Sequence, residues 1–333
     1  MEHLGSGAIQ ELPGNVGAEQ DDEEKLTGTE AKIAMILAEE GPQGSPTVAA
    51  AAATRSSIRR DVEIPKPPFW GSKVVNHVSL EAVFQYLNEI ALIRGQWRVV
   101  RGKLSEQEYQ KVLKEQIHPD FQELKAQVMR ERLLDPKVVY GYFPCQSEGN
   151  DLIIYRPIEA NNGGQLSEWL RFSFPRQRDA KHLCISDYFA SVDSKRVDVV
   201  AFHLVTVGRE ASVYSKKLFD ASKYKDYLYF HGLSVETAEA LAEYWHKKIR
   251  EELGIAGRDA QEIRKLFSQH YQGSRYSFGY PACPNLEDQR KLFELLKPEQ
   301  IEVALTEEYQ LEPEQSTSAV IVHHPEARYF NVK

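Results

Sequence analysis

The stretch RYSFGYPACP occupies residues 275–284 and lies between two patterns of helical spacing. Its two prolines, one glycine and three aromatic residues fit neither a helix nor a central strand, so the stretch predicts an ordered loop. Gly279 allows close backbone approach to a ligand, and Arg275 offers a planar guanidinium that can clamp a carboxylate through two parallel hydrogen bonds. On residue types alone two interpretations stay open. One is a binding loop; the other, the more common case, is a rigid turn with core aromatics and a solvated arginine.

Apolar residues at helical spacing flank this loop on both sides. We expect a helical block at residues 209–253, a further helix at 259–271 before the loop, and one at 286–296 after it. The sequence predicts three more helices, at 80–93, 105–116 and 121–134. Within the long block, His246 follows Glu243 by three residues, a spacing that suits a surface hydrogen bond.

Short stretches rich in β-branched and aromatic residues predict strands. They lie at residues 138–143, 151–155, 169–174 and 197–207, with two terminal strands at 318–322 and 328–332. The first two stretches flank the turn sequence QSEGN and indicate an antiparallel hairpin. Helices and strands come in blocks rather than in strict alternation. The expected fold class is therefore α+β, with a largely antiparallel sheet flanked by helices.

The N-terminal part of the chain has a different composition. Residues 1–68 contain no aromatic residue, and residues 1–54 carry ten acidic side chains against two lysines. Such a segment buries too little apolar surface to offset its ordering entropy. We therefore expect a disordered acidic tail and Ala/Pro linker over residues 1–63, followed by one domain over 64–333. The tail either tethers a partner or has no specific role, and the second interpretation is favoured.

Composition excludes several classes of protein. The net charge of -8, without a basic stripe, argues against general affinity for nucleic acid or anionic membranes, and the apolar runs are too short to span a bilayer. The three cysteines are far apart in sequence and odd in number, which fits neither a disulfide framework nor a Cys-x-x-Cys metal site. The adjacent His323 and His324 lack a nearby third ligand, so we expect no bound metal and a structural role. A reducing, cytoplasmic setting follows.

The loop at 275–284, with the YQG at 271–273 before it, closely resembles the S-adenosylmethionine-binding loop in the activation domain of cobalamin-dependent methionine synthase. The match is long, unevenly spaced and rich in uncommon residues. Further segments resemble the same family in the same order, namely GYFPC at 141–145, FSFPRQ at 172–177, CISDYF at 184–189 and HPEARYF at 324–330. The resemblance covers roughly residues 70–333 and implies a single C-shaped domain.

The resemblance also implies which residues hold the ligand. Arg275 would clamp the carboxylate of S-adenosylmethionine, and Tyr280 would lie near the cobalamin face as the catalytic residue during methyl transfer. The other implied ligand contacts are Ser277, Gly279, Tyr329, Phe330 and Glu239. For Tyr329 and Phe330 the alternative is ordinary edge-strand packing. For Glu239 the alternative is a solvated helix face, which the residue pattern alone favours.

The function implied by the resemblance is reductive methylation of cob(II)alamin, which reactivates methionine synthase within methionine biosynthesis. The sulfonium already activates the methyl group, so the protein needs only to position S-adenosylmethionine. The implied partners are the cobalamin-binding module of methionine synthase and a flavodoxin-like electron donor. The chain would be a methyltransferase that cannot methylate homocysteine alone, because it has neither a zinc-binding cysteine cluster nor an Asp-x-His-x-x-Gly motif. The alternative is a non-catalytic S-adenosylmethionine sensor or adaptor for a corrinoid protein.

The chain departs from the family pattern at a few positions. Gln269 stands where some relatives have Glu, and Ser277 stands where some have Ala. No residue matches the family's N-terminal acidic ligand contact securely, and Glu81 is the candidate. These departures bear on the affinity for the ligand more than on its identity.

Overall fold

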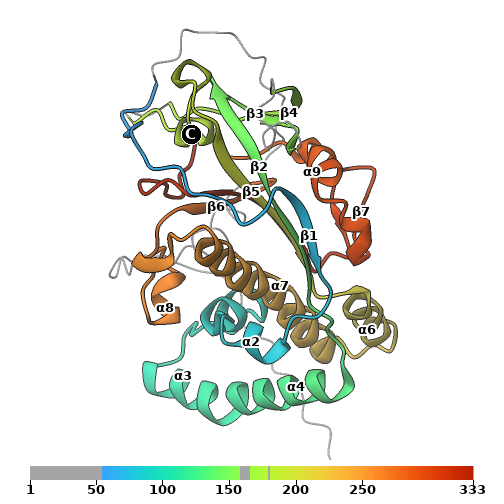
Figure 1. The fold of residues 1–333 in the computed structure, drawn as a ribbon. Coiled ribbons are helices and arrows are strands. Elements are labelled where there is room, and N and C mark those ends of the chain that lie inside the picture. Colours follow the sequence, from blue (N-terminus) through green and yellow to red (C-terminus); the bar gives the residue numbers. More distant parts are fainter. Residues whose placement is uncertain (1–54, 158–165, 179–180, 333) are drawn as a thin grey trace, which may run out of the picture.

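The computed structural model describes residues 55–157, 166–178 and 181–332. Within these residues, a seven-stranded sheet runs through the middle of the domain in the order β4-β3-β2-β5-β9-β6, with β1 also paired to β2 (Figure 1). The strands are β1 (Gly71–Val75), β2 (Lys137–Glu148), β3 (Asp151–Tyr155), β4 (Glu168–Ser173), β5 (Asp198–Thr206), β6 (Ser274–Ser277) and β9 (Ser316–Val322). Every ladder between them is antiparallel, as expected. A separate small sheet pairs β7 (Ala304–Leu305) with β8 (Leu311–Glu312).

Helices cover the sheet on both sides. The long helix α7 crosses one face, α2, α3 and α4 lie beyond it, and α9 packs on the other side (Figure 1). The helices are α2 (Leu80–Phe84), α3 (Glu106–Val112), α4 (His118–Glu131), α6 (Arg209–Asp220), α7 (Tyr224–Glu252), α8 (Ile263–Leu266) and α9 (Gln289–Leu296). Short π-helical turns lie at Ala91–Gln96 and Leu113–Ile117, and short 3-10 turns at Ile185–Tyr188, Val192–Ser194, Ala256–Arg258, Leu286–Asp288 and Pro298–Ile301.

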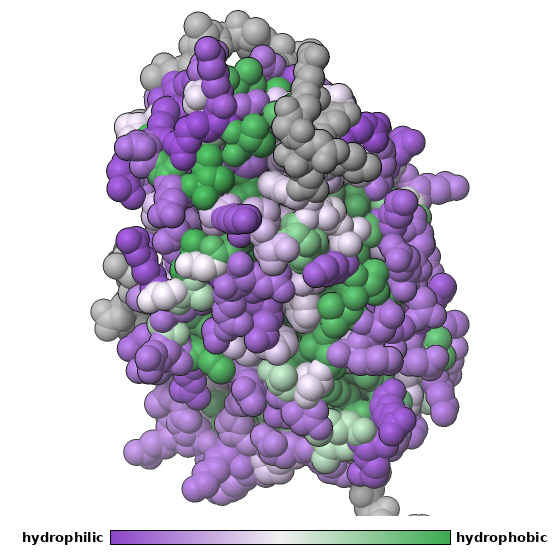
Figure 2. All heavy atoms as spheres, viewed as in Figure 1, coloured by the Kyte–Doolittle hydropathy of each residue, from purple (hydrophilic) through white to green (hydrophobic). Residues whose placement is uncertain are grey.

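The described residues form a hydrophobic cluster on each face of the sheet. Successive side chains of a strand point to opposite faces, so Val138 and Tyr140 of β2 join the cluster that contains α7, while Val139 and Phe143 join the cluster that contains α9. A strand covered on both faces is buried along most of its length, as β2 and β5 are. Outside these clusters, hydrophilic side chains cover most of the face drawn in Figure 2.

The structure confirms the α+β class but corrects several helix boundaries. The block expected at 209–253 is two helices, α6 and α7, because Ser222 between them adopts a positive φ of 57°. The helix expected at 259–271 shrinks to the four residues of α8, and Gln269, at a φ of 58°, turns the chain soon after it. The helix expected at 80–93 stops at Phe84, ahead of the π-helical turn.

Two corrections concern the segments nearest the expected site. Residues 275–277, expected in a loop, belong to the edge strand β6. The prolines of the stretch begin only at Pro281, so the backbone of β6 is free to pair with β9. The strand expected at 328–332 is absent from the described chain. In this segment the backbone carbonyl of Arg328 accepts a hydrogen bond from the Tyr276 hydroxyl at 2.8 Å, and no strand of the described chain pairs with it.

Residues 55–63, which we call the N-terminal strap, pack against the domain ahead of the expected boundary at 64. The Ser56 hydroxyl donates to the Asp187 carboxylate at 2.7 Å, and the Arg59 guanidinium donates to Glu326 at 2.8 Å. A ring nitrogen of His324 lies 2.9 Å from the Arg59 carbonyl oxygen. The expectation of a disordered tail over residues 1–54 lies outside the described residues. No helix of the described ranges is both long and apolar enough to cross a membrane.

Gly273, the residue before β6, provides a test of how the edge strand is placed. It has a φ of 90°, and a Cβ added to it would lie 2.4 Å from the Val322 carbonyl oxygen of β9. Replacing Gly273 with alanine is expected to lower the free energy of unfolding by about 2 kcal/mol or more, measured by urea titration. Gly257→Ala is the matched control, because its Cβ would meet nothing within 4 Å. Equal effects of the two substitutions would contradict the expected strain.

Candidate functional site

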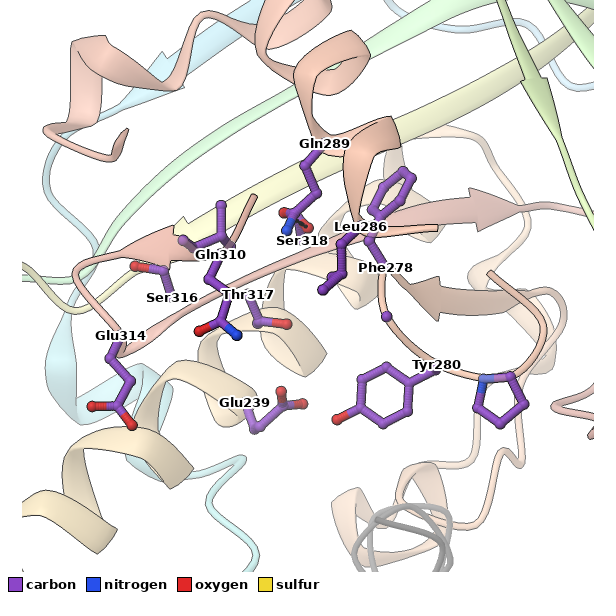
Figure 3. Close-up of a pocket in the computed structure, with 13 residues that line it drawn as sticks. Glu239, Phe278, Tyr280, Leu286, Gln289, Gln310, Glu314, Ser316, Thr317 and Ser318 are labelled. Atoms are coloured by element: carbon purple, nitrogen blue, oxygen red, sulfur yellow. Dashed lines mark hydrogen bonds between the residues drawn. The ribbon is translucent and has the colours of Figure 1, made fainter. Parts of the chain in front are cut away.

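A pocket of about 430 Å³ opens beside the turn that follows β6 (Figure 3). Helix α7 contributes Glu239 to its wall, and the turn contributes residues 278–281. Leu286 comes from the 3-10 turn before α9, and Gln289 is the first residue of α9. The segment around β8 and β9 contributes residues between Gln310 and Ser318. The pocket therefore combines segments that lie far apart in the sequence.

The pocket lining is acidic. Among lining residues in the described part of the chain, the charged ones are Glu239 and Glu314. Apolar cover comes from Phe278, Pro281 and Leu286 on the side of the turn. Carboxylates in a partly enclosed pocket favour a ligand that carries positive charge.

The turn after β6 is tight because its backbone bonds to itself. The Gly279 amide donates to the Cys283 carbonyl, and the Cys283 amide donates to the Tyr280 carbonyl, both at 2.8 Å. Gly279 has a φ of 91°, and a Cβ there would lie 3.0 Å from a methyl carbon of Leu286. This turn directs the Tyr280 ring into the pocket, with its hydroxyl toward Glu239 (Figure 3).

Arg275 lies behind the pocket rather than in its wall. It pairs across the sheet with Ile321, which belongs to the cluster on the α7 side, so its side chain also faces α7. There its Nη2 donates to Glu239 Oε2 at 3.3 Å and lies 3.6 Å from Glu243 Oε2. Burial lowers the pKa of Arg275, but Glu243 and then Glu239 outweigh burial and raise it overall. The guanidinium therefore stays charged although only 7% of its side chain is exposed.

The surroundings of Tyr280 hold its phenol in the protonated form. Burial raises the pKa of Tyr280 first, and the nearby Glu239 and Tyr329 raise it further, against the opposing charge of Arg275. Tyr280 can therefore donate a hydrogen bond at neutral pH. Tyr329 is half-buried, and its backbone amide donates to the Gln269 side chain at 3.3 Å.

The remaining expected site residues lie outside the pocket wall. Ser277 is buried within β6. Phe330 is buried against Tyr276, with ring centroids 5.8 Å apart. Glu81 is exposed on α2 and accepts a hydrogen bond from Ser79 at 2.7 Å. The structure thus brings Glu239, Gly279 and Tyr280 around one pocket and places Arg275 directly behind it.

Several residues near the pocket were not predicted. Gln289 donates to the Tyr309 carbonyl at 2.7 Å and accepts from the Ser318 hydroxyl at 2.9 Å, so its amide is held firmly in the wall. No local signal marks these side chains, since they meet only through the fold. The expected surface hydrogen bond between Glu243 and His246 is wrong, because α7 buries both residues.

The paired histidines have the structural role expected of them. A ring nitrogen of His323 lies 2.7 Å from the Asp198 carboxylate, deep in the domain. His324 instead contacts the N-terminal strap. No group of three or more His, Cys, Asp or Glu residues in the described ranges is arranged to hold a metal ion.

An antiparallel sheet backed by a long helix defines the class of the fold as α+β, and the acid-lined pocket beside the edge strand β6 is its candidate ligand site. The sequence profile of the vitamin B12 dependent methionine synthase activation domain matches residues 80–333. The chain therefore belongs to this family.

The similar proteins agree with this assignment. Methionine synthase of Mycobacterium tuberculosis is 41% identical over 291 residues, covering 84% of this chain and 24% of that protein. Methionine synthase of Mycobacterium leprae is 42% identical over 291 residues, which again cover 84% of this chain and 24% of that protein. The chain thus spans about a quarter of the length of these curated relatives. The crystal structure of the MetH reactivation domain bound to AdoHcy has a TM-score of 0.74 at 24% identity, covering 86% of this chain and 90% of that one, and confirms the fold.

Proposed function

We propose that this chain binds S-adenosylmethionine and supports the reductive methylation of cob(II)alamin, the step that reactivates cobalamin-dependent methionine synthase. The observation that carries the proposal is the acid-lined pocket with a charged arginine directly behind Glu239. S-adenosylmethionine carries a carboxylate, an ammonium and a sulfonium, so it needs both signs of charge side by side. Membership in the activation-domain family supports the same ligand.

The proposed binding step is an exchange of charged partners. The ligand carboxylate would replace Glu239 at Arg275 Nη2 and would also reach Nη1, which has no hydrogen-bond partner among the residues that the structure describes. Two parallel hydrogen bonds from one guanidinium would result. Glu239, released from Arg275, would accept the ligand ammonium. Tyr280, Gly279 and Tyr329 would cover the rest of the ligand, while Ser277 and Phe330 would support the segments that carry them.

The chain's own contribution to the reaction is positioning. The methyl group is already activated by the sulfonium, so the residues need to hold the donor and aim it outward. We propose that one electron from a flavodoxin-like donor would reduce cob(II)alamin on a cobalamin-binding module of methionine synthase to the nucleophilic form. The methyl would then pass from sulfur to cobalt, S-adenosylhomocysteine would leave, and Tyr280 would lie beside the transferred methyl. The chain would then act as a methyltransferase in the cytoplasm, where its three buried thiols stay free.

A transfer assay is expected to distinguish this function from that of a sensor or adaptor. The purified chain is mixed with a cobalamin-loaded module of methionine synthase, a reductant and methyl-labelled S-adenosylmethionine. We expect the label to appear on cobalamin, and to be absent when either the chain or the reductant is left out. Ligand binding without any transfer of label would contradict the reactivation role and favour the sensor.

A further inference from the structure

Polar side chains follow one face of α7 at alternating steps of three and four residues. They are Glu236, Glu239, Glu243, His246 and Arg250. This spacing keeps them on a single face of the helix, here the face toward the sheet. All except Glu239 are buried. Buried carboxylates are rare without a partner, so Glu243 in particular requires an explanation.

Arg275 pairs with the carboxylates of both Glu239 and Glu243, but the two carboxylates differ in their exposure to solvent. Glu239 lines the open pocket and has 24% of its side chain exposed, whereas Glu243 lies one helical turn deeper with 8% exposed. If Glu239 leaves Arg275, water or a ligand ammonium can take up its charge. If Glu243 leaves, a carboxylate stays buried without a counterion, which is strongly unfavourable. Glu239 is therefore the exchangeable partner and Glu243 the fixed one.

The next cation along this face of α7 is paired with a different carboxylate. This cation, Arg250, pairs with Asp259 at 2.8 Å. The Arg250 guanidinium also lies 4.0 Å from the centre of the Tyr271 ring, which His246 contacts from another side at 5.1 Å between centroids. Within the described chain, the ion pair of Glu243 is the one with Arg275.

The electrostatics agree with this division. Burial lowers the pKa of Arg275, and of the two carboxylates that raise it Glu243 has the larger effect, although Glu239 lies closer to Nη2. The deeper position explains the order, because less solvent screens the charge of Glu243.

We propose that Glu243 is a positioning residue, which holds the Arg275 guanidinium from inside while the ligand carboxylate replaces Glu239 outside. The proposal rests on the proposed function, since it deepens the account of the same site. Its distinctive consequence is that Glu243 acts only on ligands that carry a carboxylate. Arg275 Nη1, buried and without a hydrogen-bond partner in the described residues, is the atom that Glu243 keeps available to them.

The test compares Glu243→Gln with the parent chain against two ligands by calorimetry. One ligand is S-adenosylmethionine; the other is decarboxylated S-adenosylmethionine, which keeps the ammonium and the sulfonium. We expect the substitution to raise the Kd for S-adenosylmethionine about tenfold or more, the scale of one charge-assisted contact, and to change the Kd for the decarboxylated ligand less than about threefold. A purely structural role of Glu243 would shift both affinities equally.

Two further variants complete the test. Glu239→Gln, the matched control one turn away, should weaken both ligands, because both carry the ammonium that Glu239 accepts in the proposed function. Glu243→Asp keeps the charge and should lose less affinity for S-adenosylmethionine than Glu243→Gln, which also covers the case in which the glutamine variant folds poorly.

The outcomes separate two kinds of failure. Equal weakening of both ligands by Glu243→Gln, or no weakening of either, overturns the positioning role while the proposed function stands. A folded parent chain that binds neither ligand overturns the proposed function, and the positioning role falls with it. Selective loss for the carboxylate-bearing ligand supports both.

Discussion

Replacing Arg275 with alanine is expected to raise the Kd for S-adenosylmethionine about 30-fold or more, which corresponds to about 2 kcal/mol or more of binding free energy. In the proposed function this guanidinium takes the ligand carboxylate, and alanine removes all of its donors. The loss should appear directly in a calorimetric titration.

The loss expected for Arg275→Ala combines lost charge with lost hydrogen bonds to the ligand carboxylate. Arg275→Lys is the control that separates the two. Lysine keeps the positive charge near Glu243 but cannot form two parallel hydrogen bonds to one carboxylate. Compared with Arg275→Ala, we expect Arg275→Lys to restore more of the folding stability than of the affinity for S-adenosylmethionine. Equal affinity of the parent and Arg275→Ala would remove Arg275 from the proposed site.

The second large effect is expected on stability, at the buried pair of Arg250 and Asp259. Their side chains are 1% and 6% exposed, and the guanidinium contacts the carboxylate through Nε as well as Nη2. Arg250→Ala leaves Asp259 as an unpaired buried charge. We expect the free energy of unfolding to fall by about 3–5 kcal/mol, measured by urea titration.

An exposed ion pair provides the control for this prediction. Lys216 and Asp220 of α6 lie 3.0 Å apart with 77% and 57% of their side chains exposed. Lys216→Ala should therefore change the free energy of unfolding by less than about 1 kcal/mol. A similar loss in both variants would show that burial does not set the strength of the Arg250 pair.

The sheet was predictable from the sequence because its signals are local. The apolar run at 138–143 marks β2, and the block order of elements indicates an antiparallel arrangement. The strand continues through Glu148, so of the predicted turn QSEGN only Gly149 and Asn150 separate β2 from β3. The ends of helices were harder to predict. Ser222 and Gln269 adopt left-handed backbone conformations that neither residue type announces.

The C-terminal segment shows how the fold overrides a local pattern. Residues 328–332 include aromatic and β-branched residues typical of a strand, but they pair with no strand of the described chain. Phe330 packs on Tyr276 of β6 instead. Strand propensity indicates an extended backbone, whereas pairing depends on which sheet edges are free.

Some residues of the candidate site were predictable from the local sequence, and others were not. The turn with Gly279 and Tyr280 was predictable, since its conformation depends on adjacent residues. Glu243, Gln289 and Ser318 were not, because each becomes part of the site only through contacts across the fold. Acidic residues one turn apart on a helix normally face solvent, and only the position of β6 shows that Glu239 and Glu243 face an arginine.

The N-terminal strap matters for anyone who trims this chain for crystallography. A version that starts at Ile64 would lose Ser56 and Arg59, and with them the contacts to Asp187 and to the HPEA turn at residues 324–327. That turn leads directly into Tyr329. The proposed function places Tyr329 over the ligand, so weak binding by such a shortened protein would reflect the lost strap contacts. The cleavage point therefore belongs upstream of Arg55.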